Sequence, residues 1–239
     1  MNSSFQSPAA VAVSSEVTRR NLLDAAERLF AESGLEGASV RDITKAAGVN
    51  LGAINYHYGT KDGLILAVFT RRLKPLNDRR LALLEMVEAS CGEDQTLPLE
   101  GVLEAFLRPM VEQQGDDLQN SQAFIRLLCR CFQERNQQLE SLVYEQFGEI
   151  VRRINSALLR AVPGLPEEEV FWRVSFLFGS ANHALDSWSR FEVTPFARMP
   201  GSPVPRKLDR EALLERLVAY AAAGLRGTAG RQASPQLSQ

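Results

Sequence analysis

The chain has 239 residues, of which 45% are hydrophobic and 23% are charged, and its formal net charge is −2. This length and composition suit one large or two small globular domains and exclude a chain that is disordered throughout. The sequence contains no apolar run of about 18 residues, which excludes a membrane-spanning helix. Residues 1–16 have neither a basic start nor a sustained apolar run, so we interpret them as a disordered polar leader of a cytoplasmic protein.

The first segment with helical periodicity covers residues 18–33. Leu22, Ala26, Leu29 and Phe30 form one apolar stripe in it, and Gly34 is a natural helix stop. Similar spacing continues along nearly the whole chain, and no convincing alternating strand pattern occurs. The pattern therefore predicts an all-α protein.

Two short helices are expected next. The first covers residues 40–47, with Ser39 as its cap, and Gly48 supplies a turn after it. The second covers residues 51–58, and Asn50 can cap it. Two short helices joined by such a turn match the helix-turn-helix pattern.

A long fourth helix follows the break at Gly59 and Thr60, and Thr60 can cap it. Pro75 lies inside this helix and is expected to kink or split it. The positions expected to face inward are Leu64, Val68, Leu73, Leu76, Leu83 and Val87.

After a polar break at residues 91–98, a further series of helical patterns fills most of the chain. Four prolines and a glycine make residues 193–207 an irregular loop, and residues 227–239 form a polar tail. The expected helices cover residues 99–114, 119–134, 136–161, 166–191 and 209–225.

The N-terminal part of the chain has an excess of basic over acidic residues. Residues 1–80 hold 11 Lys and Arg against 8 Asp and Glu, a balance of +3, whereas the remainder holds 16 against 21, a balance of −5. This asymmetry suits a small DNA-binding module fused to an acidic partner domain.

The second short helix carries the side chains that suit DNA. In a helix-turn-helix its N-terminal part enters the major groove. Gly52 and Ala53 keep that end slim, and Asn55 can present an amide to a base edge. Tyr56 and His57 can offer a hydroxyl and a ring nitrogen to the DNA backbone.

These residues resemble the TetR family of bacterial transcriptional regulators. The matching parts are Leu29 to Ser39 (LFAESGLEGAS), Val40 to Val49 (VRDITKAAGV), Tyr56-His57-Tyr58, and Lys61 with Leu64. The resemblance implies an N-terminal three-helix DNA-binding domain and a C-terminal helical domain for ligand binding and dimerisation. We accordingly expect the two domains to cover residues 17–63 and 64–226.

In this family, residues around the recognition helix contact DNA. The resemblance implies phosphate contacts from Ser39, Tyr56, His57 and Lys61, with Gly52, Ala53 and Asn55 facing bases. Two plainer interpretations stay open, because Ser39 can be a cap alone and Lys61 a solvated charge. The complete set of expected DNA-binding residues is Ser39, Arg41, Asn50, Leu51, Gly52, Ala53, Asn55, Tyr56, His57 and Lys61.

Two positions depart from the commonest family pattern. Asn55 stands where many members have tyrosine, and Tyr58 stands where most have phenylalanine. We expect Tyr58 to pack inward with Ile54. Asn55 leaves the base contacts open, because an amide favours adenine without dictating a whole site.

The remainder of the chain is rich in aromatic residues, which on their own indicate helix-packing core. The resemblance implies instead that some of them line a mainly apolar effector pocket with a few polar anchors. The effector would be a small hydrophobic or acyl-bearing molecule. The expected ligand-binding residues are Phe106, Phe124, Arg126, Cys129, Arg130, Phe147, Phe176 and Asn182.

The segment 170–188 is apolar nearly all round, which indicates that it is covered on both sides. We expect residues 166–191 and 209–225 to pack against their copies in a homodimer, as in family members.

Cysteine and histidine residues do not indicate a metal site. The cysteines are Cys91, Cys129 and Cys131, and the histidines are His57 and His183. Their spacing matches no metal-binding motif, so we expect free thiols, no metal and no cofactor.

The leading hypothesis is a homodimeric, ligand-responsive repressor that binds a near-palindromic double-stranded operator. A second hypothesis is an architectural or cell-cycle DNA-binding protein on the same fold, without a ligand. An enzyme is not expected, because no Gly-rich phosphate loop, nucleophile elbow or His-centred triad occurs, and no catalytic residue is assigned.

Overall fold

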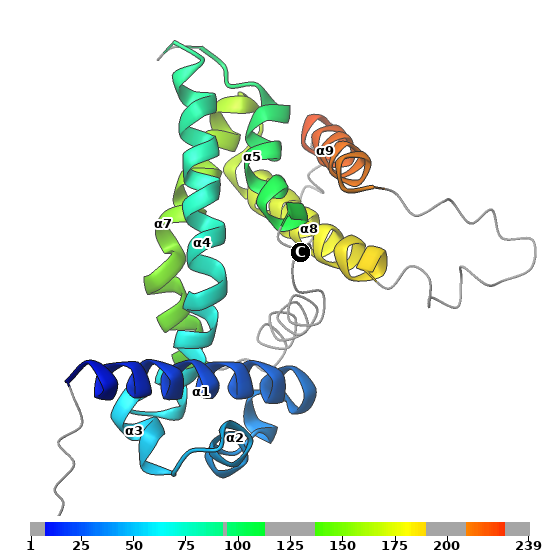
Figure 1. Ribbon diagram of the computed structural model, residues 1–239. Coiled ribbons are helices and arrows are strands. Elements are labelled where there is room, and N and C mark those ends of the chain that lie inside the picture. The colour runs from blue at the N-terminus through cyan, green and yellow to red at the C-terminus, as the bar shows by residue number, and fades with distance from the viewer. Residues whose placement is uncertain (1–7, 93–94, 113–136, 190–208, 228–239) are drawn as a thin grey trace, which may run out of the picture. The chain divides into compact units, whose positions relative to one another are not determined.

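The computed structural model describes residues 8–92, 95–112, 137–189 and 209–227. Helices and the turns between them make up these residues, and no strand occurs among them (Figure 1). The all-α prediction is therefore confirmed for the described part of the chain. The described residues fall into two compact units, which we call the first unit (8–78 and 137–148) and the second unit (79–92, 95–112, 149–189 and 209–227). The domain limits expected from the sequence stay a prediction.

Helix α1 (Pro8–Gly37) begins well before the expected start at residue 18. Residues 8–16 are helical, which corrects the prediction of a disordered leader over that stretch; residues 1–7 lie outside the described part. A proline suits the first helical position, because the amide hydrogen that it lacks would have no partner there. Gly34 interrupts the helix with a φ of 82°, close to the predicted stop.

Helices α2 (Val40–Ala47) and α3 (Gly52–Tyr58) pack against the same side of α1 (Figure 1). The core between these three helices consists of large apolar side chains that are almost completely buried. These side chains are Leu22, Phe30, Leu35, Ile43 and Ile54. The periodic apolar residues of the sequence thus form the support for the two short helices.

Helix α4 (Lys61–Ala89) is one continuous helix whose residues belong to both units. Pro75 is exposed and does not split α4, contrary to one of the two expected outcomes. A proline on an exposed helix face leaves its unpaired carbonyl partner open to water, which makes it easier to tolerate. Leu64, Val68 and Leu76 are buried as predicted. Farther along, Leu84 is buried while its neighbour Leu83, together with Leu73 and Val87, is only half-buried.

A group of ion pairs around one buried glutamate joins α1 to α4 within the first unit. We call Asp24, Glu27, Arg71 and Arg72 the Glu27 cluster. Glu27 is only 2% exposed, and its carboxylate accepts hydrogen bonds from Arg71 and, at 2.9 Å, from Nε of Arg72. Arg71 also donates to Asp24 at 2.5 Å. A carboxylate this deeply buried needs such partners to remain charged.

The second unit contains α5 (Leu99–Glu112), the second half of α7 (Gln137–Ala161), α8 (Glu167–Ser189) and α9 (Arg210–Arg226). These helices begin and end within a few residues of the predicted limits. Within the unit, α9 packs against α5 and, less extensively, against α8 (Figure 1). The helix expected at 119–134 and the loop expected at 193–207 lie outside the described residues, as does the tail beyond residue 227.

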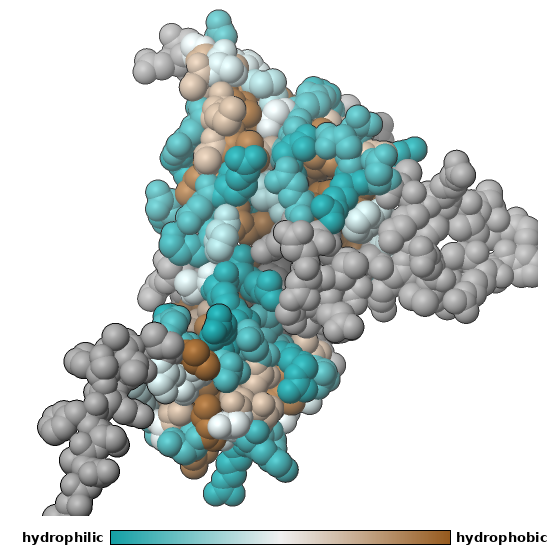
Figure 2. Space-filling model, in the orientation of Figure 1, coloured by the Kyte–Doolittle hydropathy of each residue, from teal (hydrophilic) through white to brown (hydrophobic). Residues whose placement is uncertain are grey.

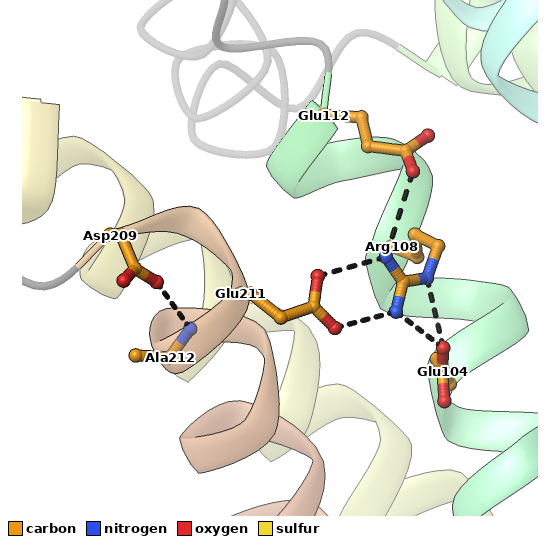
Figure 3. A network of polar contacts seen from close by, with 6 residues as sticks. All are labelled: Glu104, Arg108, Glu112, Asp209, Glu211 and Ala212. Carbon is orange, nitrogen blue, oxygen red and sulfur yellow. Dashed lines mark hydrogen bonds and ion pairs between the residues drawn. The ribbon is translucent and has the colours of Figure 1, made fainter.

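Ion pairs supplement the apolar contact between α5 and α9. Arg108 of α5 lies among three carboxylates: Glu104 at 2.6 Å and Glu112 at 3.8 Å in its own helix, and Glu211 of α9 at 2.8 Å (Figure 3). Asp209 caps α9 through a hydrogen bond from the amide of Ala212 at 2.8 Å. The same close-up shows this cap beside the Arg108 contacts.

The other end of α9 is held by α8. Arg173 of α8 donates from one guanidinium nitrogen to the carbonyl oxygens of Gly224, Leu225 and Gly227 at 2.7 to 3.2 Å. These carbonyls close the C-terminus of α9, where helical partners are missing and positive charge is favourable.

On the face drawn in Figure 2, hydrophilic and hydrophobic side chains are interspersed over the described surface.

Candidate nucleic-acid interface

The turn between α2 and α3 has the geometry that the sequence predicted. Gly48 has φ 68° and ψ 31°, a left-handed conformation that favours glycine, and its amide donates to the carbonyl of Lys45 at 3.2 Å. Thr44 is buried, and its hydroxyl donates to the carbonyl of Val40 at 3.0 Å within α2. A small side chain that satisfies its own polar group lets α2 approach its neighbours closely.

Ser39 caps α2 as predicted. Its hydroxyl oxygen accepts a hydrogen bond from the amide of Asp42 at 3.2 Å, and its hydroxyl hydrogen is donated to the Asp42 carboxylate at 2.5 Å. Ser39 is exposed, but its donor is engaged by a negative side chain. A phosphate contact from this hydroxyl therefore requires the bond to Asp42 to be replaced.

Helix α3 has one buried side and one exposed side. Ile54 is 1% exposed and anchors the helix against the core, as expected. Asn55 and Tyr56 point away from that core, and Tyr56 is 82% exposed. The rings of Tyr56 and His57 meet edge to face, with centroids 4.9 Å apart. The structure thus presents the Asn55 amide and the Tyr56 phenol on the exposed side of α3, with the half-buried His57 imidazole beside Tyr56.

The cap predicted for α3 is wrong in one detail. The position that precedes the helix is Leu51, and no side chain bonds to the free amides there. Asn50 takes part through its backbone carbonyl, which accepts from the amide of Ala53 at 3.1 Å. The Asn50 side chain is exposed and is not used as a cap.

Tyr58 is half-buried on the side of α3 that faces α1. Its hydroxyl donates to the backbone carbonyl of Arg19 at 2.9 Å. Burial raises the pKa of the Tyr58 phenol above its usual value, and the positive charge of Arg19 opposes part of that rise. Inward packing was predicted, but this hydrogen bond was not; the replacement of the usual phenylalanine by tyrosine was the available signal.

The start of α4 fits closely against the end of α3. The side chain of Thr60 accepts from the amide of Gly63 at 3.0 Å, so Thr60 caps the helix as predicted. A β-carbon at Gly63 would lie 2.1 Å from the carbonyl oxygen of Tyr58, so no larger residue fits there without a shift. Lys61, the first residue of α4, is half-buried beside this junction.

All ten predicted DNA-binding residues lie on one continuous stretch of the first unit. Ala53, His57 and Lys61 are half-buried, and the remaining seven are exposed. Their contacts with DNA stay a prediction. The exposed residues are Ser39, Arg41, Asn50, Leu51, Gly52, Asn55 and Tyr56.

Only three of the predicted ligand-binding residues can be placed. Phe106 is half-buried, with the guanidinium carbon of Arg80 4.3 Å from the centre of its ring. Phe176 is 64% exposed and stacks on Trp172, which does not suit the wall of an enclosed pocket in a single chain. Asn182 is buried, but its amide donates to the carbonyl of Phe178 in its own helix. The side chains of Phe124, Arg126, Cys129, Arg130 and Phe147 lie outside the description.

The second unit has an open hollow of about 390 Å³ that the sequence did not predict. It is lined by residues 161–165 and 225–227, at the turn after α7 and the end of α9. None of the predicted ligand-binding residues lines it. Its walls thus give no support to the predicted aromatic pocket.

Three general features concern the described part of the chain. None of its helices is long and apolar enough to cross a membrane. Its His, Cys, Asp and Glu side chains form no group of three that could hold a metal ion. Cys91 is a free thiol.

Comparison with known families identifies both parts of the chain. Residues 22–68 match the bacterial regulatory proteins of the tetR family, and residues 104–224 match the tetracyclin repressor-like C-terminal domain. The chain is 47% identical over 51 residues to the transcriptional repressor AcnR of Corynebacterium glutamicum. That match covers 21% of this chain and only 27% of the length of AcnR.

Solved structures resemble the chain over most of its length. The fatty acid degradation regulator FadR of Bacillus halodurans aligns with a TM-score of 0.59 at 18% identity, covering 88% of this chain and 97% of that protein. The regulator FadR of Bacillus subtilis, solved in complex with stearoyl-CoA, aligns with a TM-score of 0.56 at 17% identity, covering 86% and 98%. At identities this low, the structural similarity establishes a shared fold alone.

Proposed function

Because the chain belongs to the TetR family of bacterial regulatory proteins, we propose that it is a DNA-binding transcriptional repressor. In this proposal a homodimer binds a near-palindromic operator and is released by a small, largely apolar effector. The observation that carries the proposal is the two-sided α3: Ile54 fixes the helix in the core, while Asn55 and Tyr56 stand free on the other side.

In the proposal, five residues of the helix-turn-helix and the start of α4 have separate roles. With the N-terminal part of α3 in the major groove, Gly52 lets the backbone approach and Asn55 offers its amide to a base edge. Tyr56 and Lys61 contact backbone phosphates on the flanks of the groove, together with Arg41. Phosphate contacts supply affinity for any sequence, whereas Asn55 supplies preference among sequences.

The dimer is supported by apolar side chains that a single chain leaves in water. Four large side chains of α8 and α9 are between 50% and 64% exposed. Exposed apolar area of this kind marks an interaction surface, and a two-fold contact between identical helices would bury it. Two recognition helices could then reach half-sites about 34 Å apart. The four side chains are Phe171, Trp172, Phe176 and Tyr220.

The effector is the least supported part of the proposal. Bacillus subtilis FadR, which has the same fold, was solved with stearoyl-CoA. An apolar ligand would weaken DNA binding only if it bound one arrangement of the dimer more tightly than the other. A coupling of about 1 to 3 kcal/mol would lower operator affinity roughly 5- to 150-fold. If acyl or aromatic compounds raise the melting temperature of the protein but leave its operator affinity unchanged, ligand binding does not control DNA binding. That result would favour a ligand-independent architectural protein over a ligand-responsive repressor.

Titration of the full chain with random-sequence duplex DNA tests the proposal directly. Wild-type protein is expected to bind, with an affinity that falls steeply as salt rises. Lys61→Ala is expected to weaken binding to every duplex about equally. Absence of binding at low salt, with the chain folded and dimeric by light scattering, would contradict the proposed function.

A further inference from the structure

Helix α1 carries two neighbouring arginines that lie outside the helix-turn-helix. Arg19 and Arg20 are adjacent and exposed. The backbone of Arg19 is held against α3, because its carbonyl accepts the hydroxyl of Tyr58 at 2.9 Å. Tyr58 is the last residue of α3, so this bond places the backbone of Arg19 beside the C-terminal end of the recognition helix, and Arg20 follows it in α1.

The dimensions of α3 determine what lies at its ends. Its seven residues span about 10 Å, at 1.5 Å per residue, whereas the major groove is about 12 Å wide. A helix that fills the groove therefore has the phosphates of the bordering strands beyond its ends. An exposed side chain whose backbone is anchored at an end of α3 is consequently closer to backbone phosphates than to base edges.

The chemistry of the pair suits such a partner. A guanidinium group can bind a phosphate through two parallel hydrogen bonds. Arg19 has one weak competitor, Glu16, whose carboxylate lies 3.8 Å away; the two side chains are 53% and 71% exposed. An exposed ion pair of this kind contributes about 0 to 1 kcal/mol, so it does not prevent Arg19 from turning to a phosphate.

We propose that Arg19 and Arg20 form an additional phosphate-binding site for the DNA backbone, and that the Tyr58 hydroxyl is the positioning group that holds this turn of α1 at the end of α3. The proposal rests on the proposed function and extends the DNA-contacting surface beyond the helix-turn-helix to α1. It also explains the hydrogen bond from the Tyr58 hydroxyl to α1, which phenylalanine at position 58 could not form.

The test is the salt dependence of binding to random-sequence duplex DNA. Each phosphate contact contributes about 0.9 to the slope of log affinity against log salt concentration. The double variant R19Q/R20Q is expected to reduce that slope by about 1 to 2 per chain, with an unchanged melting temperature. The matched control is Arg28→Gln, because Arg28 is also an exposed arginine of α1, 55% accessible and in a weak ion pair with Glu32. It should leave the slope unchanged.

A double-mutant comparison tests the role of Tyr58. Tyr58→Phe is expected to lower DNA affinity several-fold in the wild-type background and to have no effect in the R19Q/R20Q background. The proposal is overturned if R19Q/R20Q keeps the wild-type slope, or if Tyr58→Phe acts equally in both backgrounds. Failure of the wild-type chain to bind DNA is a different result, because it refutes the proposed function itself.

Discussion

Removing the charge of Glu27 is expected to destabilise the first unit strongly. The Glu27→Gln change leaves Arg71 and Arg72, whose side chains are 27% and 21% exposed, facing a neutral amide that is almost fully buried. Breaking a buried ion pair by removing one partner costs about 3 to 5 kcal/mol. We expect the lower end, about 3 kcal/mol, because both arginines retain access to water and Arg71 keeps Asp24.

The matched control is Asp24→Asn. It removes another carboxylate from the same arginine, but the Asp24 side chain is 61% exposed, so the expected loss is below about 1 kcal/mol. Urea unfolding should be followed by far-UV circular dichroism. Both tryptophans, Trp172 and Trp188, lie in α8, so their fluorescence monitors the second unit alone. If Glu27→Gln costs no more than Asp24→Asn, the Glu27 cluster does not hold α1 to α4.

Three further predictions concern other parts of the chain. Phe176→Glu is expected to give monomers by light scattering, because it places a charge on the exposed apolar side of α8; a dimer of wild-type stability would contradict this. Gly63→Ala is expected to lower the free energy of unfolding of the first unit by at least about 1 kcal/mol, and with it the urea midpoint, because the new carbon would collide with the Tyr58 carbonyl. An unchanged midpoint would show that the junction can relax. The raised pKa of Tyr58 means that the folded state retains its phenol proton to higher pH than the unfolded state, so the stability from this group is present below pH 10 and lost as pH rises through the folded pKa. Between neutral pH and pH above 10, the melting temperature of Tyr58→Phe should therefore fall less than that of the wild type. Equal falls for the two proteins would contradict a raised pKa at Tyr58.

Local signals in the sequence were sufficient for the helix-turn-helix. Ser39, Gly48 and Thr60 each act on residues three or four positions away, so their roles as caps and turn follow from sequence spacing alone. The early start of α1 was missed, because residues 8–16 have no apolar stripe to indicate a helix. The family resemblance then supplied the arrangement of the domains, which periodicity could not.

Contacts between distant residues could not be predicted. The hydroxyl of Tyr58 bonds to a residue 39 positions earlier, and Glu27 pairs with Arg71 44 positions later. The aromatic residues of α8 show a different limit. A helix that is apolar all round can pack inside one chain or against another copy, and Phe176, predicted to line a pocket, is instead exposed.

In the proposed function, α3 distinguishes DNA sequences through Asn55. Selection of bound duplexes from a random pool by wild-type protein, with Asn55→Ala selected in parallel, tests it most directly. The wild-type chain is expected to enrich near-palindromic sites whose half-sites are separated by about one helical turn, roughly 10 base pairs. Asn55→Ala is expected to change the base preference at one position in each half-site while the spacing stays the same. A wild-type selection without any enriched sequence, or identical base preferences for the two proteins, would contradict the account.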